Sequence, residues 1–187
     1  MDIKIYIDQG HNPQNPNAGA EGNGLREQDI VFRIGILLAD LLRSNPNFEV
    51  RLSRPTAETQ IGTSNTTSLR QRVADANSWG ADYFISLHTN ASEIAAATGV
   101  EAFAFSRSSP AFALGEDILT ALSAETGLRN RGMQVRSGLY VVRKTAMPSL
   151  LIELGFITNP NDARLMSQQP ELFARGIYNG ILNYFNL

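Results

Sequence analysis

Two spacings of hydrophobic residues alternate along the chain. In residues 3–8, isoleucines alternate with polar or amphipathic residues, as expected for a strand with one buried face. Short apolar runs of about four to eight residues bounded by turn-forming residues also indicate strands. Six segments meet one of these criteria and are predicted as strands: residues 3–8, 48–53, 82–87, 99–105, 139–143 and 149–154.

Other segments carry apolar residues at the spacing of three and four that is typical of an amphipathic helix. The first of them begins at Leu25 and ends before Pro46. Gly80 and Gly127 stand where glycine commonly ends a helix. The predicted helices cover residues 25–45, 69–79, 111–126 and 170–187.

Strands that alternate with helices predict an α/β fold with a largely parallel sheet. The length of 187 residues suits one domain with a full core and is short for two. We therefore expect residues 1–187 to form a single domain, with a twisted, mostly parallel sheet of about six strands and helices on both of its faces.

Residues 9–24 form the longest stretch without periodicity between the first strand and the first helix. They read QGHNPQNPNAGAEGNG and are rich in Gly, Asn and Pro. A loop of this length inside a compact domain is usually functional. We therefore expect this loop to contribute to a site.

Composition excludes several classes of partner. The formal net charge is −2 and no cluster of Lys and Arg indicates a nucleic-acid surface. No apolar run approaches the roughly 18 residues of a membrane span. Met1 leads directly into a charged strand, so we expect no signal peptide within this sequence. The sequence then describes either a cytosolic protein or the catalytic domain of a longer exported one.

One stretch of the sequence, SLLIELGFITN in residues 149–159, places a carboxylate in unusual surroundings. Glu153 lies within an apolar run, where an unpaired carboxylate takes up a proton or finds a cation. The two histidines of the chain, His11 and His88, also follow apolar strand-like runs. Because the carboxyl ends of parallel strands meet at one edge of a sheet, these three side chains predict one shared site there.

These residue types indicate a zinc hydrolase. The chain has no Cys, so a metal would be held by His and carboxylate. Hydrolytic zinc sites commonly use three such ligands and leave a fourth position for water. His11 and His88 supply two ligands, and either Glu27 or Glu21 could supply the third. Glu153 would then transfer protons between water and the leaving group.

Each candidate also has a structural explanation. A histidine at a strand end is often simply hydrogen-bonded, and an acidic residue in a first helical turn, such as Glu27, is already favoured by the helix dipole. Glu153 could be a buried carboxylate paired with Arg143 or Arg129. The residues alone leave these alternatives open.

Three further residues are candidates for binding substrate. Arg54 and Arg72 could each bind a substrate carboxylate through two hydrogen bonds, or could form structural ion pairs. Asn90, two residues after His88, could donate a hydrogen bond to substrate or could form a turn.

The ordered motifs resemble a known family. They are IYIDQGHNP, GLREQDIVF, SRPT, LRQRVADAN, YFISLHTNAS and SLLIELGFITNPND, and they span nearly the whole chain. In this order they are similar to the catalytic domain of zinc-dependent N-acetylmuramoyl-L-alanine amidases of the amidase_3 type, which includes autolysins, sporulation and germination amidases, and phage endolysins. Many relatives have Gly directly after the first His, where this chain has Asn12 and Pro13.

The resemblance implies one zinc ion bound by His11, Glu27 and His88, and it favours Glu27 over Glu21. It implies Glu153 as the acid-base residue in hydrolysis of the amide between N-acetylmuramic acid and the L-alanine of the stem peptide. The implied partner is peptidoglycan, with no nucleic acid and no membrane insertion. The implied location is the cell wall or envelope, with any wall-binding modules outside this chain.

Two other functions are compatible with the same residues. The first is a zinc amidohydrolase or peptidase that acts on a different amide, because metal chemistry does not specify the substrate. The second is a cell-wall-binding domain that has the fold without turnover. The products of digestion would distinguish these functions.

Overall fold

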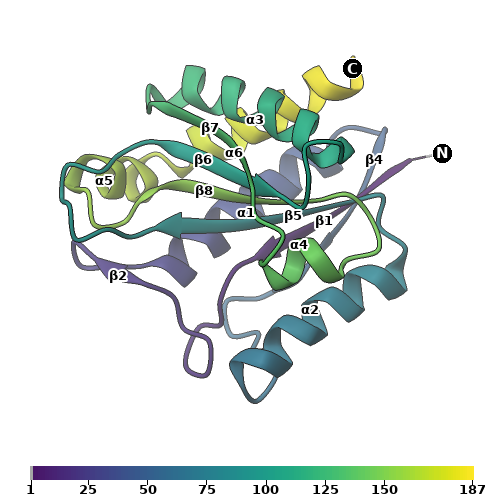
Figure 1. Cartoon of the computed structure of the whole chain (residues 1–187), viewed down its shortest axis with the longest axis horizontal. Helices are drawn as coiled ribbons and strands as arrows, with labels where there is room; N and C mark the ends of the chain where they lie inside the picture. The colour runs from purple at the N-terminus through teal and green to yellow at the C-terminus, as the bar shows by residue number, and fades with distance from the viewer. Residues whose placement is uncertain (1) are drawn as a thin grey trace.

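The computed structural model describes residues 2–187, so only Met1 of the predicted domain lies outside the described residues. A six-stranded sheet forms its centre (Figure 1). Across the sheet the order is β4-β1-β5-β8-β6-β7; β4, β1, β5 and β8 run parallel, β6 is antiparallel to β8, and β7 is parallel to β6. The strands are β1 (Ile3–Gln9), β4 (Phe48–Leu52), β5 (Tyr83–Asn90), β6 (Val100–Ala104), β7 (Asn130–Val135) and β8 (Ser149–Phe156). The prediction of a mostly parallel sheet is confirmed.

Helices cover both faces of the sheet, as predicted (Figure 1). The larger core lies between one face and α1, α3, α5 and α6, and the smaller core lies between the other face and α2 and α4. The helices are α1 (Glu27–Arg43), α2 (Asn65–Trp79), α3 (Pro110–Thr126), α4 (Tyr140–Lys144), α5 (Pro160–Gln168) and α6 (Pro170–Phe185). Gly80 ends α2 and Gly127 ends α3, each in the left-handed conformation.

The alternation of side chains along the strands places His88 and Glu153 on the same face of the sheet. Phe84, Leu151 and Phe103 belong to the smaller core under α2 and α4. Because successive side chains in a strand point to opposite faces, residues separated by two share a face. His88 on β5 and Glu153 on β8 therefore lie on the face of the smaller core, near the carboxyl ends of their strands.

Two parts of the secondary-structure prediction are wrong. Residues 139–143 were predicted as a strand, but Tyr140–Lys144 forms the short helix α4. The run LYVVR is too short to show helical spacing, and its β-branched valines favour a strand locally. The strand Asn130–Val135 was missed because it lies at the edge of the sheet with mostly exposed side chains and so has no hydrophobic alternation.

Three boundaries that matter for the site also differ from the prediction. A two-strand hairpin, β2 (Glu21–Gly22) and β3 (Leu25–Arg26), interrupts the loop, so α1 begins at Glu27 and not at Leu25. β5 extends to Asn90, so His88 lies within the strand and not after it, and β8, which contains Glu153 as predicted, extends to Phe156. The helix Pro160–Gln168 was not predicted. Within residues 2–187, no helix combines the length and hydrophobicity needed to cross a membrane.

Candidate metal centre

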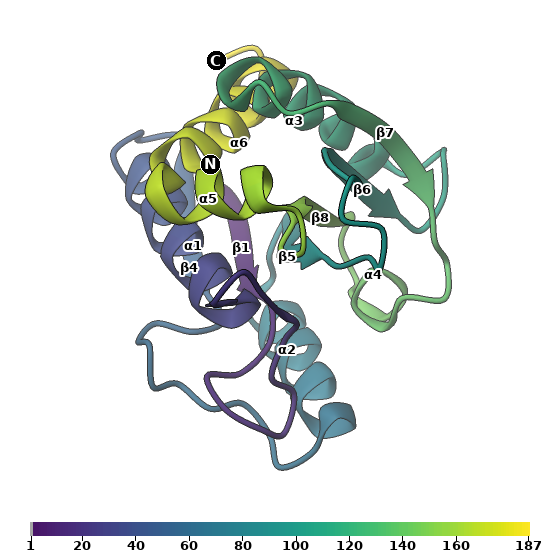
Figure 2. The ribbon, with the colours of Figure 1, turned by 90° about the vertical axis from the view of Figure 1, so that its left-hand side faces the viewer.

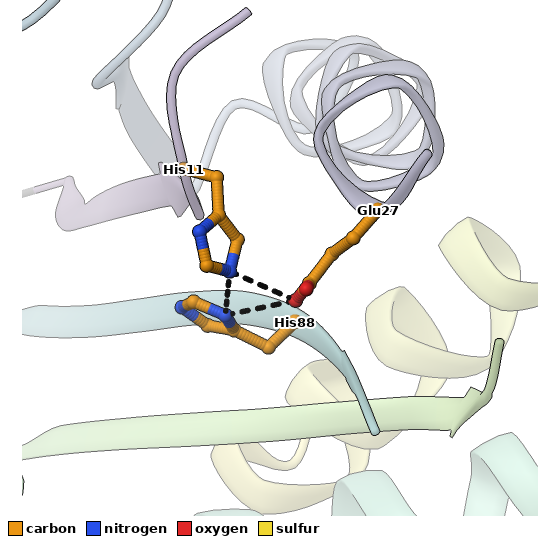
Figure 3. A group of neighbouring side chains, drawn as sticks. All are labelled: His11, Glu27 and His88. Atoms are coloured by element: carbon orange, nitrogen blue, oxygen red, sulfur yellow. Dashed lines mark hydrogen bonds and ion pairs between the residues drawn. The ribbon is translucent and has the colours of Figure 1, made fainter. Parts of the chain in front are cut away.

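Three side chains from distant parts of the sequence converge at the carboxyl edge of the sheet (Figure 3). His11 follows β1, Glu27 opens α1, and His88 belongs to β5. The atoms His11 Nε2, His88 Nδ1 and Glu27 Oε1 form a triangle in which each pair is 3.1 Å apart. Both histidine side chains are about one-fifth exposed and Glu27 is buried, so the triangle faces solvent on one side.

This donor set fits a divalent metal such as zinc. Ligands about 2.0–2.1 Å from a tetrahedral zinc ion stand roughly 3.3 Å apart, close to the observed separations. The set contains two imidazole nitrogens and one carboxylate oxygen, which are common zinc ligands. This group of His11, Glu27 and His88 could therefore bind a metal ion.

Backbone groups orient the Glu27 carboxylate. Its Oε2 accepts a hydrogen bond from the Ala20 N–H at 2.9 Å, and its Oε1 accepts one from the Thr89 N–H at 2.9 Å. Burial alone would raise the pKa of Glu27, but the hydrogen bonds and charges of His11 and His88 lower it well below the ordinary value. Glu27 is therefore ionised, as a metal ligand must be.

The structure distinguishes Glu27 from Glu21, the two candidates for the third metal ligand that spacing in the sequence left open. Glu21 is exposed on β2, and β2 pairs with β3 so that Glu21 lies opposite Arg26. Glu27 lies beside both histidines. Among the described residues, the group with metal-ligand geometry includes Glu27 and does not include Glu21.

Two glycines that the sequence reasoning did not single out make room for the three side chains. A Cβ at Gly10 would lie 2.5 Å from the His88 ring, and one at Gly19 would lie 2.8 Å from Glu27 Oε2. His11, between them, has a φ of 66°, which is costly for a residue other than glycine. Their positions beside His11 in the glycine-rich loop were a signal that could have identified them.

Asn12 anchors the loop that carries His11. Its side-chain amide donates to the carbonyl oxygens of Pro16 and Ile61, and its Oδ1 accepts from the Ile61 N–H at 3.1 Å. The residue is fully buried. Asn12 is thus part of the framework of the loop.

Glu153 lies next to His88 on the neighbouring strand, because the two residues are register partners of β8 and β5. Its Oε2 is buried and has no hydrogen-bond partner among the described residues. Burial raises the pKa of Glu153 to about 7; His88 opposes this effect, and Glu27 and Glu101 add to it. No ion pair joins Glu153 to Arg143 or Arg129 within residues 2–187. A carboxyl group with a pKa near neutrality can both accept and donate a proton.

A second carboxylate, Glu101, lies directly opposite Glu153 on β6. Unlike Glu153, it has several donors: Asn90 Nδ2 at 2.6 Å, Gln134 Nε2 at 2.9 Å and Arg131 Nε at 3.4 Å. The two neighbouring carboxylates therefore differ, because Glu101 is satisfied within the fold and Glu153 is not.

Arg54 and Arg72, the two arginines considered for substrate binding, are both buried, and a role for them in binding substrate stays a prediction. Each residue is 1% exposed. Arg54 donates to the carbonyl oxygens of Gln28 and Ala57, both at 3.0 Å. Both terminal nitrogens of the Arg54 guanidinium are thus bonded within the fold, while its buried Nε has no hydrogen-bond partner among the described residues. Arg54 therefore holds the loop after β4 against α1.

Arg72 has a related structural role beside His11. Its guanidinium forms a buried ion pair with Asp8 at 2.5 Å and donates to the carbonyl oxygens of Gln9 and His11 at 2.7 Å and 2.5 Å. Ser86 also donates to Asp8 at 2.7 Å. Arg72 therefore fixes the backbone that places His11, and the structural ion pair considered for it is observed.

Asn90 also lies close to the site but is engaged within the protein. Its Nδ2 donates to Glu101, and its Oδ1 accepts from the Ala91 N–H at 2.9 Å. Each of its polar atoms thus has a partner. Its assignment as a substrate-binding residue stays a prediction.

Comparison with known proteins places this geometry in context. The model of the family Amidase_3, described as N-acetylmuramoyl-L-alanine amidase, matches residues 5–183. The chain is 36% identical to the N-acetylmuramoyl-L-alanine amidase CwlM of Bacillus licheniformis over 99% of this chain and 70% of that protein. It is 32% identical to a sporulation-specific N-acetylmuramoyl-L-alanine amidase of Bacillus subtilis over 99% of this chain and 69% of that protein.

A solved structure agrees with these sequence matches. The crystal structure of an N-acetylmuramoyl-L-alanine amidase from Clostridium difficile 630 superposes with a TM-score of 0.88 at 28% identity, covering 99% of this chain and 97% of that chain. The chain belongs to the Amidase_3 family of N-acetylmuramoyl-L-alanine amidases.

Proposed function

We propose that this member of the Amidase_3 family is a zinc-dependent peptidoglycan amidase that cleaves the bond between N-acetylmuramic acid and the L-alanine of the stem peptide. The observation that carries the proposal is the triangle of His11, Glu27 and His88 beside Glu153, a buried carboxyl group without a hydrogen-bond partner. The family match over residues 5–183 supports the choice of substrate.

His11, Glu27 and His88 would hold the zinc ion. Zinc at this position would lower the pKa of a water molecule to about 7 and polarise the substrate carbonyl. The lowered pKa of Glu27 keeps this ligand charged, and the two backbone N–H groups that bind its carboxylate prevent it from rotating away.

Glu153 would perform the proton transfers. In its ionised form it takes a proton from the attacking water, and then donates that proton to the departing nitrogen of L-alanine. Its buried Oε2 has no hydrogen-bond partner among residues 2–187 that would hold it in one protonation state. The same carboxyl group can thus serve as base and then as acid.

The pH dependence of hydrolysis should reflect the raised pKa of Glu153. Burial raises this pKa to about 7. Because the base must be ionised, kcat/KM should fall in proportion to the ionised fraction as the pH drops through neutrality. An acid limb near the ordinary glutamate pKa of about 4.3 would contradict this. Zinc content measured at each pH separates loss of the base from protonation of a ligand.

Digestion of purified peptidoglycan tests the reaction itself. We expect released stem peptides with a new L-alanine amino terminus and no new reducing sugar ends, as read by mass spectrometry. Peptides with another amino terminus would favour an amidohydrolase or peptidase with a different substrate. Binding to the wall without any released peptide from zinc-loaded protein would favour the non-catalytic domain.

The proposal also gives the domain its place in the cell. Peptidoglycan as substrate locates the activity at the cell wall or envelope. Residues 1–187 would form a single zinc amidase catalytic domain, and any wall-binding module would lie in sequence outside them.

A further inference from the structure

The segment that contains β7 and α4 is rich in basic residues. Between Glu125 and Glu153 the sequence contains no acidic residue but five basic ones: Arg129, Arg131, Arg136, Arg143 and Lys144. Among the described residues, Arg131 is the one of these five that lies within ion-pair distance of a carboxylate. In a chain of net charge −2, this local excess of positive charge indicates a surface suited to an anion.

Arg136 is the member of this group that contacts Phe103, a side chain on the face of the candidate site. Its guanidinium carbon is 4.3 Å from the centroid of the Phe103 ring, and its backbone N–H donates to the Ala104 carbonyl at 3.0 Å. Phe103 is the register partner of Leu151, two residues before Glu153 on the same face. Two residues of a strand span roughly 7 Å, so Arg136 stands close to Glu153.

The charge of Arg136 is not neutralised within the described fold. Glu101, the other nearby carboxylate, is already bound by Asn90, Gln134 and Arg131. Arg136 lowers the pKa of Glu153 through its charge but does not approach that carboxylate within ion-pair distance. An exposed guanidinium stacked on an aromatic ring is thus available for an external carboxylate.

The order of the strands shows on which side of the site Arg136 lies. From β1 through β5 and β8 to β6, the sheet presents first His11, then His88, then Glu153, and then Phe103 with Arg136. Figure 2 views the sheet from the edge where β1, β5 and β8 end, with β6 and β7 on the side away from β1. Arg136 therefore lies beyond Glu153 as seen from the metal ligands.

This position coincides with the path of the leaving peptide, an argument that rests on the proposed function. The residue that protonates the leaving nitrogen must contact it. The stem peptide attached to that nitrogen then continues on the Glu153 side of the site, toward β6. Stem peptides carry carboxylates, both on the residue after L-alanine and at the carboxyl terminus.

We propose that Arg136 binds a carboxylate of the stem peptide and positions the leaving group against Glu153. Its planar guanidinium can form two parallel hydrogen bonds with a carboxylate, and the Phe103 ring beneath it holds the plane in place. Arg136 is thus a determinant of specificity for acidic stem peptides.

Synthetic muramoyl peptides with zinc-loaded protein test this assignment. One substrate has both carboxylates free, a second has the residue after L-alanine amidated, and a third has the terminal carboxylate amidated. Wild type should lose about 10- to 100-fold in kcat/KM, mainly through KM, on the substrate that lacks the bound carboxylate. Arg136→Gln should show the same loss on the free substrate and no further loss on that amidated substrate. Arg136→Lys should be intermediate, because it keeps the charge without the planar fork.

Arg43→Gln is the matched control. It removes one exposed positive charge at the end of α1, about 24 Å along that helix from Glu27, and should change none of the three rates. Equal losses for Arg136→Gln on all three substrates, or no loss on any, would overturn the proposal. Equal losses on all three substrates would indicate instead that Arg136 acts through the pKa of Glu153.

Binding separates failure of this proposal from failure of the proposed function. Affinities of the three intact peptides are measured for the Glu153→Gln protein with and without Arg136→Gln. A binding preference for one carboxylate that is lost in the Arg136→Gln variant supports the assignment of Arg136. This conclusion holds even if wild type cleaves none of the peptides, a result that would instead overturn the proposed amidase function. Equal affinities for all three peptides in both proteins would overturn the assignment of Arg136.

Discussion

Glu153→Gln should reduce kcat for peptidoglycan hydrolysis by about 10²- to 10⁴-fold, the usual contribution of a positioned acid-base group. The amide has nearly the shape of the carboxyl group, but it cannot accept a proton from water. Glu153 lies on β8 opposite His88, and its Oε2 forms no hydrogen bond within the described protein, so the substitution breaks no such bond at that atom. We therefore expect the fold and the zinc content to be retained.

The measurement pairs single-turnover release of stem peptides with zinc content and thermal unfolding. Glu116→Gln is the matched control, because Glu116 is exposed on α3, which packs on the opposite face of the sheet. It should leave all three quantities unchanged. Near-normal hydrolysis by Glu153→Gln at full zinc content would move the proton transfers to another residue.

His88→Ala should bind zinc more than about 100-fold more weakly, since loss of even an outer-shell partner of a metal ligand costs about 10–100-fold. The substitution removes one corner of the triangle in which His88 Nδ1 lies 3.1 Å from both His11 Nε2 and Glu27 Oε1. Only two candidate ligands, His11 and Glu27, remain. Hydrolysis should fall together with zinc occupancy.

Titration of chelator-treated protein with zinc measures this effect directly. Wild type should regain one zinc ion per chain and its activity together, whereas His88→Ala should regain neither at the same zinc concentration. Glu21→Gln is the matched control within the loop, because Glu21 is exposed on β2 and lies outside the triangle. Full zinc occupancy in His88→Ala would remove His88 from the ligand set.

The Glu153→Gln and His88→Ala substitutions affect different steps, proton transfer and metal binding, so their results can be told apart. Loss of Glu153 should spare the metal and abolish proton transfer, whereas loss of His88 should remove the metal itself. If both variants lost zinc equally, Glu153 would belong to the metal centre and not to proton transfer.

The pattern of the sequence was sufficient for the architecture and for the position of the site. Alternation in residues 3–8 and helical spacing after Leu25 arise from local burial, and each pattern is visible without any partner segment. The parallel sheet followed from the alternation of strands and helices. Because parallel strands end at a common edge, the strand-end positions of His11, His88 and Glu153 predicted a shared location.

Tertiary structure decided the questions that depend on distant residues. Spacing alone left Glu27 and Glu21 as alternatives that only the resemblance separated, and the folded loop shows directly that the Glu27 carboxylate meets the histidines. Sequence spacing could not show that Arg54 is buried and donates to backbone carbonyl oxygens, which depends on the folded chain. The strand β7 and the helix α4 were misjudged because an edge strand and a five-residue helix take their form from neighbours, not from their own periodicity.

What the sequence determined by itself was therefore the set of chemical groups and the approximate ends of the elements that carry them. What the tertiary structure decided was which of these groups are satisfied inside the fold, as Arg72 and Glu101 are, and which remain available, as Glu153 and Arg136 do. The physical reason is that burial and hydrogen-bond pairing are properties of contacts between segments far apart in the chain, whereas spacing reports only on each segment alone.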